Sequence, residues 1–136
     1  MVPVQELPNR LLRDGRAVLA RYGYRRLDAL PGEGSFDWAA LWDQLRGDFA
    51  THDHPAVPPL DALPGEAAAA ARAYMVCGLD ADLKLDRCEA LHVRLFAEGI
   101  GTGLVEEYAL ARDAYEDAVE AFGAAAARLA PLLFSH

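Results

Sequence analysis

Large side chains recur every seven residues in the last third of the chain, and this spacing limits what the segment can form. One series consists of Tyr108, Tyr115, Phe122 and Leu129. A second series, three places on, consists of Leu104, Ala111, Ala118, Ala125 and Leu132. Two such series share one face of an α-helix and form the seam along which it packs on another helix. The pattern therefore predicts one long helix from about Gly103 to Ala130.

The seam can be covered in two ways. The alanine-rich helix expected earlier in the chain offers small side chains that let two helix axes come close. A second copy of the chain could use the same face instead, which would make the chain a homodimer. On the second alternative, the interface with a protein partner would be formed by Tyr108, Tyr115, Phe122 and Leu129.

Helical periodicity also marks four segments before this helix. They are residues 8–22, residues 35–49 with Ser35 as the N-cap and Asp37 in the first turn, residues 66–77 ending at Gly78, and residues 80–98 capped by Asp80 and ending at Gly99. No stretch alternates with period two for long enough to predict a strand. We therefore expect an all-α fold, a compact bundle of about five helices with a long C-terminal helix.

Residues 50–65 carry four prolines and no hydrophobic period, so the sequence predicts a long surface connection there. The segment is the only plausible place to divide the chain. Neither side of it has enough surface to bury on its own, and a chain of 136 residues fits one core. We therefore expect a single helical domain over residues 1–136.

Two tryptophans lie on one face of the second expected helix. Trp38 and Trp42 share this face with Leu41, Leu45 and Phe49, which lie at steps of three and four residues from them and from each other. An aromatic face of this kind usually packs into the core, where each indole buries about 150–250 Å². The alternative is a ligand pocket formed by Trp38 and Trp42 beneath the long connection.

The charge balance bears on the class of partner. The net charge is -8, and six arginines in residues 1–30 make that segment the one basic part of an acidic chain. Nucleic acid is a poor partner for such a chain, because affinity for it depends on neutralising phosphates with Lys and Arg. No apolar run reaches the roughly 18–20 residues that span a bilayer, and no leader peptide is recognisable, so we expect no membrane partner and a cytoplasmic protein.

Two groups of residues could bind a transition metal such as Fe, Mn or Zn. Glu89 and His92 are three residues apart, a spacing that brings a carboxylate and an imidazole to one ion in helical bundles. His52 and His54 lie in the long connection and could fold over the same position. Each group supplies only two ligands, and a polar helix edge and a polar loop explain these residues without metal. We therefore expect no cofactor and keep a metal site as the alternative.

Nucleophilic catalysis has little support in the sequence. The chain has two serines, one at an expected helix cap and one next to the last residue, and neither Cys77 nor Cys88 has an activating base beside it. Both cysteines lie on apolar helix faces, where they act as small hydrophobic residues. The sequence favours a non-enzymatic, acidic helical binding or assembly module, in an accessory, inhibitor or immunity-type role. The alternative is a small helical metal- or ligand-binding protein.

Overall fold

The computed structural model describes residues 37–51, 57–99 and 103–134. Within these ranges the elements are α2 (Trp38–Thr51), the short 3-10 helix η3 (Leu60–Ala62), α3 (Gly65–Glu98) and α4 (Leu104–Phe134). This part of the chain is all-helical and has no strand, which confirms the predicted fold class. A bundle of about five helices is not confirmed: the two helices predicted over residues 66–98 are one, and the helix expected at residues 8–22 lies outside the described residues.

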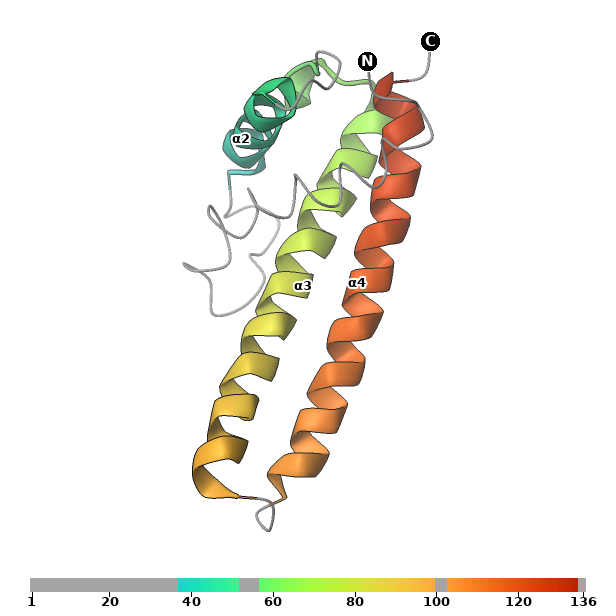
Figure 1. The fold of residues 1–136 in the computed structure, drawn as a ribbon. Helices are drawn as coiled ribbons and strands as arrows, with labels where there is room; N and C mark the ends of the chain where they lie inside the picture. Colours follow the sequence, from blue (N-terminus) through green and yellow to red (C-terminus); the bar gives the residue numbers. More distant parts are fainter. Residues whose placement is uncertain (1–36, 52–56, 100–102, 135–136) are drawn as a thin grey trace.

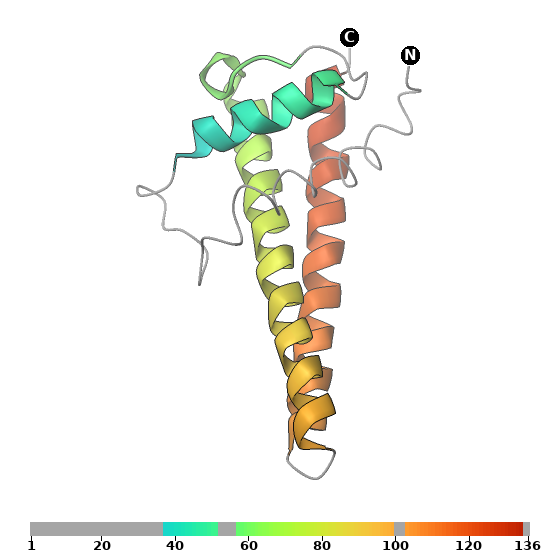
Figure 2. The same ribbon diagram turned by 60° about the vertical axis from the view of Figure 1, so that its left-hand side comes forward.

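The two long helices form an antiparallel hairpin, and α2 lies across one end of it (Figures 1 and 2). That end is where α3 begins and α4 ends. We call it the base of the hairpin, and we call the end where the chain turns from α3 into α4 the tip. Among the described helices, only α3 and α4 reach the tip.

The base holds the larger of two hydrophobic clusters. Leu41, Trp42 and Leu45 of α2 are all 0% exposed. On the hairpin, the Tyr74 and Phe122 rings pack with centroids 5.0 Å apart. Small side chains beside them allow the axes of α3 and α4 to approach; these are Ala70, Ala71, Ala125 and Ala126. The core thus forms where three helices meet.

The helix α3 is continuous over 34 residues, so the two helices predicted on either side of Gly78 are one. Asp80 is not an N-cap: its carboxylate accepts hydrogen bonds of 2.7 Å from the Lys84 ammonium, one turn later in the same helix. A glycine inside a helix costs only about 1 kcal/mol. Burial of Met75 and Leu79, on either side of Gly78, contributes about 1.5–3 kcal/mol each and keeps the helix intact.

The start of α2 is capped by Asp37. Its Oδ1 accepts a 3.0 Å hydrogen bond from the Ala40 amide, as an N-cap side chain does. The sequence predicts Asp37 in the first turn and Ser35 at the cap; Ser35 lies outside the described residues. At its other end α2 continues to Thr51, so the helix includes the first two residues of the predicted connection.

The rest of the described connection packs on α2. Val57 is buried, and the Trp42 indole Nε1 donates a 2.9 Å hydrogen bond to the Pro58 carbonyl. Arg46 donates a longer hydrogen bond, 3.4 Å, to the Val57 carbonyl. The segment then forms η3 before α3 begins. The predicted long connection is therefore tied to the helix that precedes it.

The long C-terminal helix is confirmed, four residues longer at its end than predicted. Most of its seam is buried within the chain: Leu104, Ala111, Ala118, Phe122, Ala125 and Leu129. Because α4 packs along the length of α3, the seam is covered within the chain. The alanine-rich segment covers its part at the base, and the later α3 residues Cys88 and Leu91 cover its part at the tip. This is the first of the two alternatives that the heptad pattern left open.

Two glycines around α4 give opposite predictions. A Cβ added at Gly123, inside the helix, meets nothing within 4 Å, so Gly123→Ala should raise the free energy of unfolding by about 0.5–1 kcal/mol. Gly103 has a φ of 78°, where a side chain costs about 1–2 kcal/mol, so Gly103→Ala should lower it. Guanidinium unfolding followed by circular dichroism measures both; a lower midpoint for Gly123→Ala would contradict the packing described for α4.

Candidate functional site

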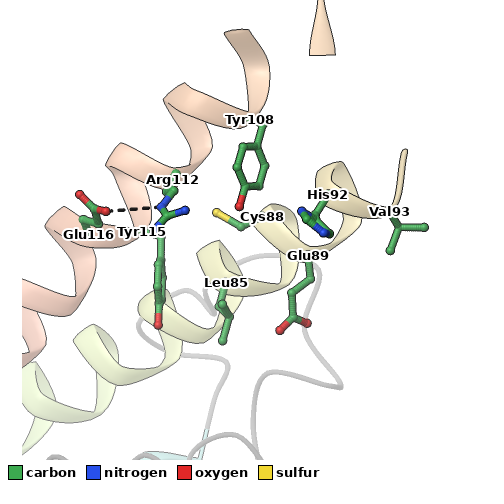
Figure 3. A pocket seen from close by; sticks show the side chains of 9 residues that line it. All are labelled: Leu85, Cys88, Glu89, His92, Val93, Tyr108, Arg112, Tyr115 and Glu116. Atoms are coloured by element: carbon green, nitrogen blue, oxygen red, sulfur yellow. Dashed lines mark ion pairs between the residues drawn. The ribbon is translucent and has the colours of Figure 1, made fainter. Parts of the chain in front are cut away.

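A groove of about 510 Å³ opens between α3 and α4 toward the tip (Figure 3). Residues of both helices line it: Leu85, Cys88, Glu89, His92, Val93, Tyr108, Arg112, Tyr115 and Glu116. Its surface is mostly apolar, and charged side chains of both signs are set among the apolar ones. This combination is common in binding sites, in which apolar area supplies affinity and a few polar groups fix orientation.

The α3 wall of the groove follows from helical spacing. Leu85, Glu89, His92 and Phe96 are separated by steps of four, three and four residues, so they form one stripe along the helix. The His92 ring lies 6.4 Å from the Phe96 ring and 5.9 Å from the Tyr108 ring of α4, measured between centroids. These ring contacts join the two walls and connect the groove to Phe96. We call these four residues the α3 stripe.

Arg112 places a fixed positive charge at the groove. Its guanidinium hydrogen-bonds the Tyr108 hydroxyl and pairs with Glu116, Nε to Oε1 3.5 Å, and these interactions, that with Tyr108 first, raise the pKa of Arg112 above its ordinary value. The side chain is therefore a cation at every physiological pH. An ion pair this exposed adds little to stability, so its effect is on the orientation and charge of the groove.

Cys88 contributes apolar surface to the groove. The residue is 6% exposed, and burial raises the pKa of its thiol above its ordinary value, an effect that the nearby Arg112 only partly offsets. Burial likewise raises the pKa of the Cys77 thiol in the base. A protonated thiol is a poor nucleophile, so both cysteines act as small hydrophobic residues, as the sequence predicted. Both are free thiols.

Beyond the groove, the tip exposes large apolar side chains. Phe96 is 90% exposed and Val93 is 66% exposed. Val93 lines the groove, and Phe96 joins it through the ring contact with His92. Exposed apolar surface that is continuous with a groove makes the tip the candidate binding surface of the described chain.

The four predicted interface residues divide into two pairs. Phe122 and Leu129 are 2% and 0% exposed and lie in the core at the base, so their packing partners are within the chain. Tyr108 and Tyr115 are half-buried and line the groove. A role in binding a partner thus stays a prediction for the two tyrosines alone.

The two tryptophans are core residues. Trp38 is 7% exposed and Trp42 0% exposed, and both belong to the cluster at the base. The Arg72 guanidinium lies 5.8 Å from the Trp38 ring, on the side of α3. This placement agrees with core packing, the first of the two alternatives for these residues. Residues 52–56 of the connection that would cover the suggested ligand pocket lie outside the described residues.

The residues of the alternative metal site are only partly placed. Glu89 and His92 are exposed on the α3 stripe, while His52 and His54 lie outside the described residues. No group of three or more His, Cys, Asp or Glu side chains that could hold a metal ion occurs in the part of the chain that the structure describes. In that part, Glu89 and His92 therefore have no third ligand beside them.

Comparisons of this chain with family models, curated proteins and solved structures give no match. Across the described helices, none combines the length and the apolar character needed to cross a membrane. The functional interpretation therefore depends on the groove and its surroundings.

Sequence reasoning missed Arg112 and the exposure of Phe96. The first had a signal, since Arg112 is one turn after Tyr108 and one turn before Glu116, where side chains of one helix meet. The exposure of Phe96 had no signal in the sequence, because Phe96 continues the apolar face of α3 and looks like a core residue.

Proposed function

We propose that this chain is a non-enzymatic helical binding module that binds a protein partner at the tip of its hairpin. The observation that carries the proposal is the exposure of Phe96 and Val93 beside a groove with an apolar floor. A helix of the partner would lie along the groove with its apolar face against Leu85, Cys88 and Tyr115. Two helices offer such a groove naturally, since a third helix packed between them buries the surface that they leave open.

The charges of the hairpin support a protein partner. Exposed acidic side chains lie on α4 outside the groove; they are Glu106, Asp113, Asp117 and Glu120. Such a surface repels nucleic acid, and it lies outside the lining of the groove, so a protein bound in the groove need not cover it. The size and acidity suit an accessory, inhibitor or immunity-type role. Two free thiols suit a reducing compartment, and we place this role in the cytoplasm.

The groove favours binding over covalent catalysis. Cys88 is the thiol among its lining residues, and the raised pKa keeps that thiol protonated. Arg112 is held by Tyr108 and Glu116 and remains a cation, so it cannot transfer a proton. The groove therefore offers a partner apolar surface area and charged side chains that are held in place.

A photo-cross-linking amino acid at position 96 tests the proposal. In the full-length chain, produced in its native cells, we expect one discrete cross-linked protein adduct from position 96. We expect none from position 120, which is exposed on α4 outside the groove. The partner identified by mass spectrometry should then bind the purified chain in a defined ratio, and Val93→Asp should weaken that binding by about tenfold or more.

Three results would contradict the proposal. The first is the absence of any protein adduct at position 96. The second is a partner whose binding to the purified chain is unchanged by Val93→Asp. An adduct formed inside a single chain would show that another part of the same molecule covers the tip, and it would also count against a binding surface there.

A further inference from the structure

We propose that the partner at the tip is a second copy of this chain, bound so that the two α3 helices run antiparallel along the α3 stripe. This inference rests on the proposed function and names its partner. Two hairpins joined in this way form a four-helix arrangement at their tips, a common way for helical hairpins to bury an open face.

The order of residues in the α3 stripe is its own complement. Leu85 and Phe96 are apolar and lie at its two ends, and Glu89 and His92 are polar and lie between them. Because the steps are four, three and four residues, the pattern is the same when it is read from either end. A twofold axis level with residues 90 and 91 would bring Glu89 of each copy to His92 of the other. It would also bring Phe96 of each copy to Leu85 of the other. Isologous interfaces have this reciprocity.

The groove supplies the place for the exposed ring. Leu85 and Phe96 are eleven residues apart, which is about 16 Å along a helix rising 1.5 Å per residue. In the antiparallel arrangement, Phe96 of one copy reaches the part of the groove lined by Leu85 and Tyr115 of the other. The most exposed large apolar side chain of the described chain is then buried against an apolar surface twice, once in each half of the dimer.

Charge selects the antiparallel direction. If the two α3 helices ran parallel about a twofold axis, Glu89 would face Glu89 and Phe96 would face Phe96 of the other copy. Two carboxylates would then repel each other, and the groove would stay empty. In the antiparallel direction each Glu89 carboxylate accepts a hydrogen bond from a His92 imidazole.

The weak packing of the tip also favours a second copy. The buried residues of its cluster are Cys88, Leu91, Leu104 and Ala111, which give much less apolar burial than the cluster at the base. Stable interfaces bury about 1,200–2,000 Å² in total, more than one stripe on α3 supplies. Tyr108 and Tyr115 of α4 widen the contact, so both helices of each hairpin take part.

The oligomeric state of the full-length chain is the first test. Sedimentation equilibrium should give twice the 14.7 kDa mass of one chain, with a monomer–dimer equilibrium. Phe96→Asp should weaken association by at least about 30-fold, the effect of losing a central anchor residue. Leu110→Asp is the matched control: Leu110 is 71% exposed near the same tip but lines a second, smaller hollow, so association should not change.

A charge exchange tests the register. Glu89→Lys places an ammonium group against His92 of the other copy, and His92→Glu places two carboxylates together, so each should weaken association by about five- to tenfold. The double variant Glu89→Lys with His92→Glu restores an opposite-charge pair on both sides of the axis. Its association should return to within about threefold of the wild type, which a contact with an unrelated surface would not produce.

A disulfide gives an independent check on the register. Cysteines introduced by Leu85→Cys and Phe96→Cys in one chain are about 16 Å apart along α3, too far to bridge within the chain. Oxidation of the double variant should give a covalent dimer that joins position 85 of one copy to position 96 of the other. The wild type, with its two natural thiols, is the background control.

Three results would overturn the inference. They are a monomer at all concentrations up to about 100 µM, a dimer that persists in Phe96→Asp, and a dimer that the double charge variant does not restore. Failure of the inferred self-association is distinguishable from failure of the proposed binding function. A monomeric chain whose position 96 still cross-links to a different protein would leave the binding module intact and remove only the self-association.

Discussion

The variant Leu129→Asp is expected to unfold the chain. Leu129 is 0% exposed in the base core, so the substitution removes a buried side chain and puts a carboxylate in its place. Truncation of a buried leucine costs about 2–5 kcal/mol, and the carboxylate must also be protonated or lose its water. A domain of this size is stable by only about 5–15 kcal/mol, so the variant has little or no stability left.

The measurement is the helical circular dichroism signal with its denaturation midpoint. Leu110→Asp is a matched control, the same exchange on the same helix at a site 71% exposed, and it should change stability by no more than about 0.5 kcal/mol. A folded, monomeric Leu129→Asp protein would contradict the core described for the base. It would indicate that Leu129 belongs to an interface between chains.

The variant Trp42→Ala is expected to lose about 3–5 kcal/mol of stability. The indole is 0% exposed, so alanine leaves a large cavity between α2 and the hairpin. The hydrogen bond from Nε1 to the Pro58 carbonyl is lost as well, and with it the tie between α2 and the connection that follows. The effect should therefore reach residues 57–59.

Trp42→Phe separates the two contributions. Phenylalanine keeps most of the apolar volume and removes the donor, so we expect a smaller loss, about 1–2 kcal/mol. Relative to the wild type, Trp42→Ala should accelerate backbone amide hydrogen exchange more at the start of α3 than at the tip. Equal stability of the alanine variant and the wild type would show that α2 does not pack on the hairpin as described.

The helices were predictable where side-chain periodicity was long and unbroken. The series from Tyr108 to Leu129 predicted α4 and its seam, because seven-residue spacing over several turns fits no other regular structure. The break at Gly78 was wrong, because glycine and Asp80 are local signals of weak preference. Burial of Met75 and Leu79 in the same core stabilises the continuous helix by more than these local preferences disfavour it. Which side chains are buried depends on tertiary packing, and the residues next to Gly78 in the sequence do not show it.

The candidate site was predictable only in part. Glu89, His92, Tyr108 and Tyr115 were all singled out from spacing, and the structure brings them to one groove. The exposure of Phe96 was not predictable, because the apolar side of α3 is wider than one neighbouring helix covers. Leu91 faces α4 and is buried; His92, about 100° further around the helix, points to the open side.

The continuity of α3 separates two tasks in space. Tyr74 in the base core and Phe96 at the tip belong to one helix and are about 33 Å apart along it, at 1.5 Å per residue. The larger hydrophobic cluster lies at one end, and the binding surface that we propose lies at the other. A substitution at the tip therefore leaves the larger core untouched, so the shape and charge of that surface can change at a small cost in folding stability.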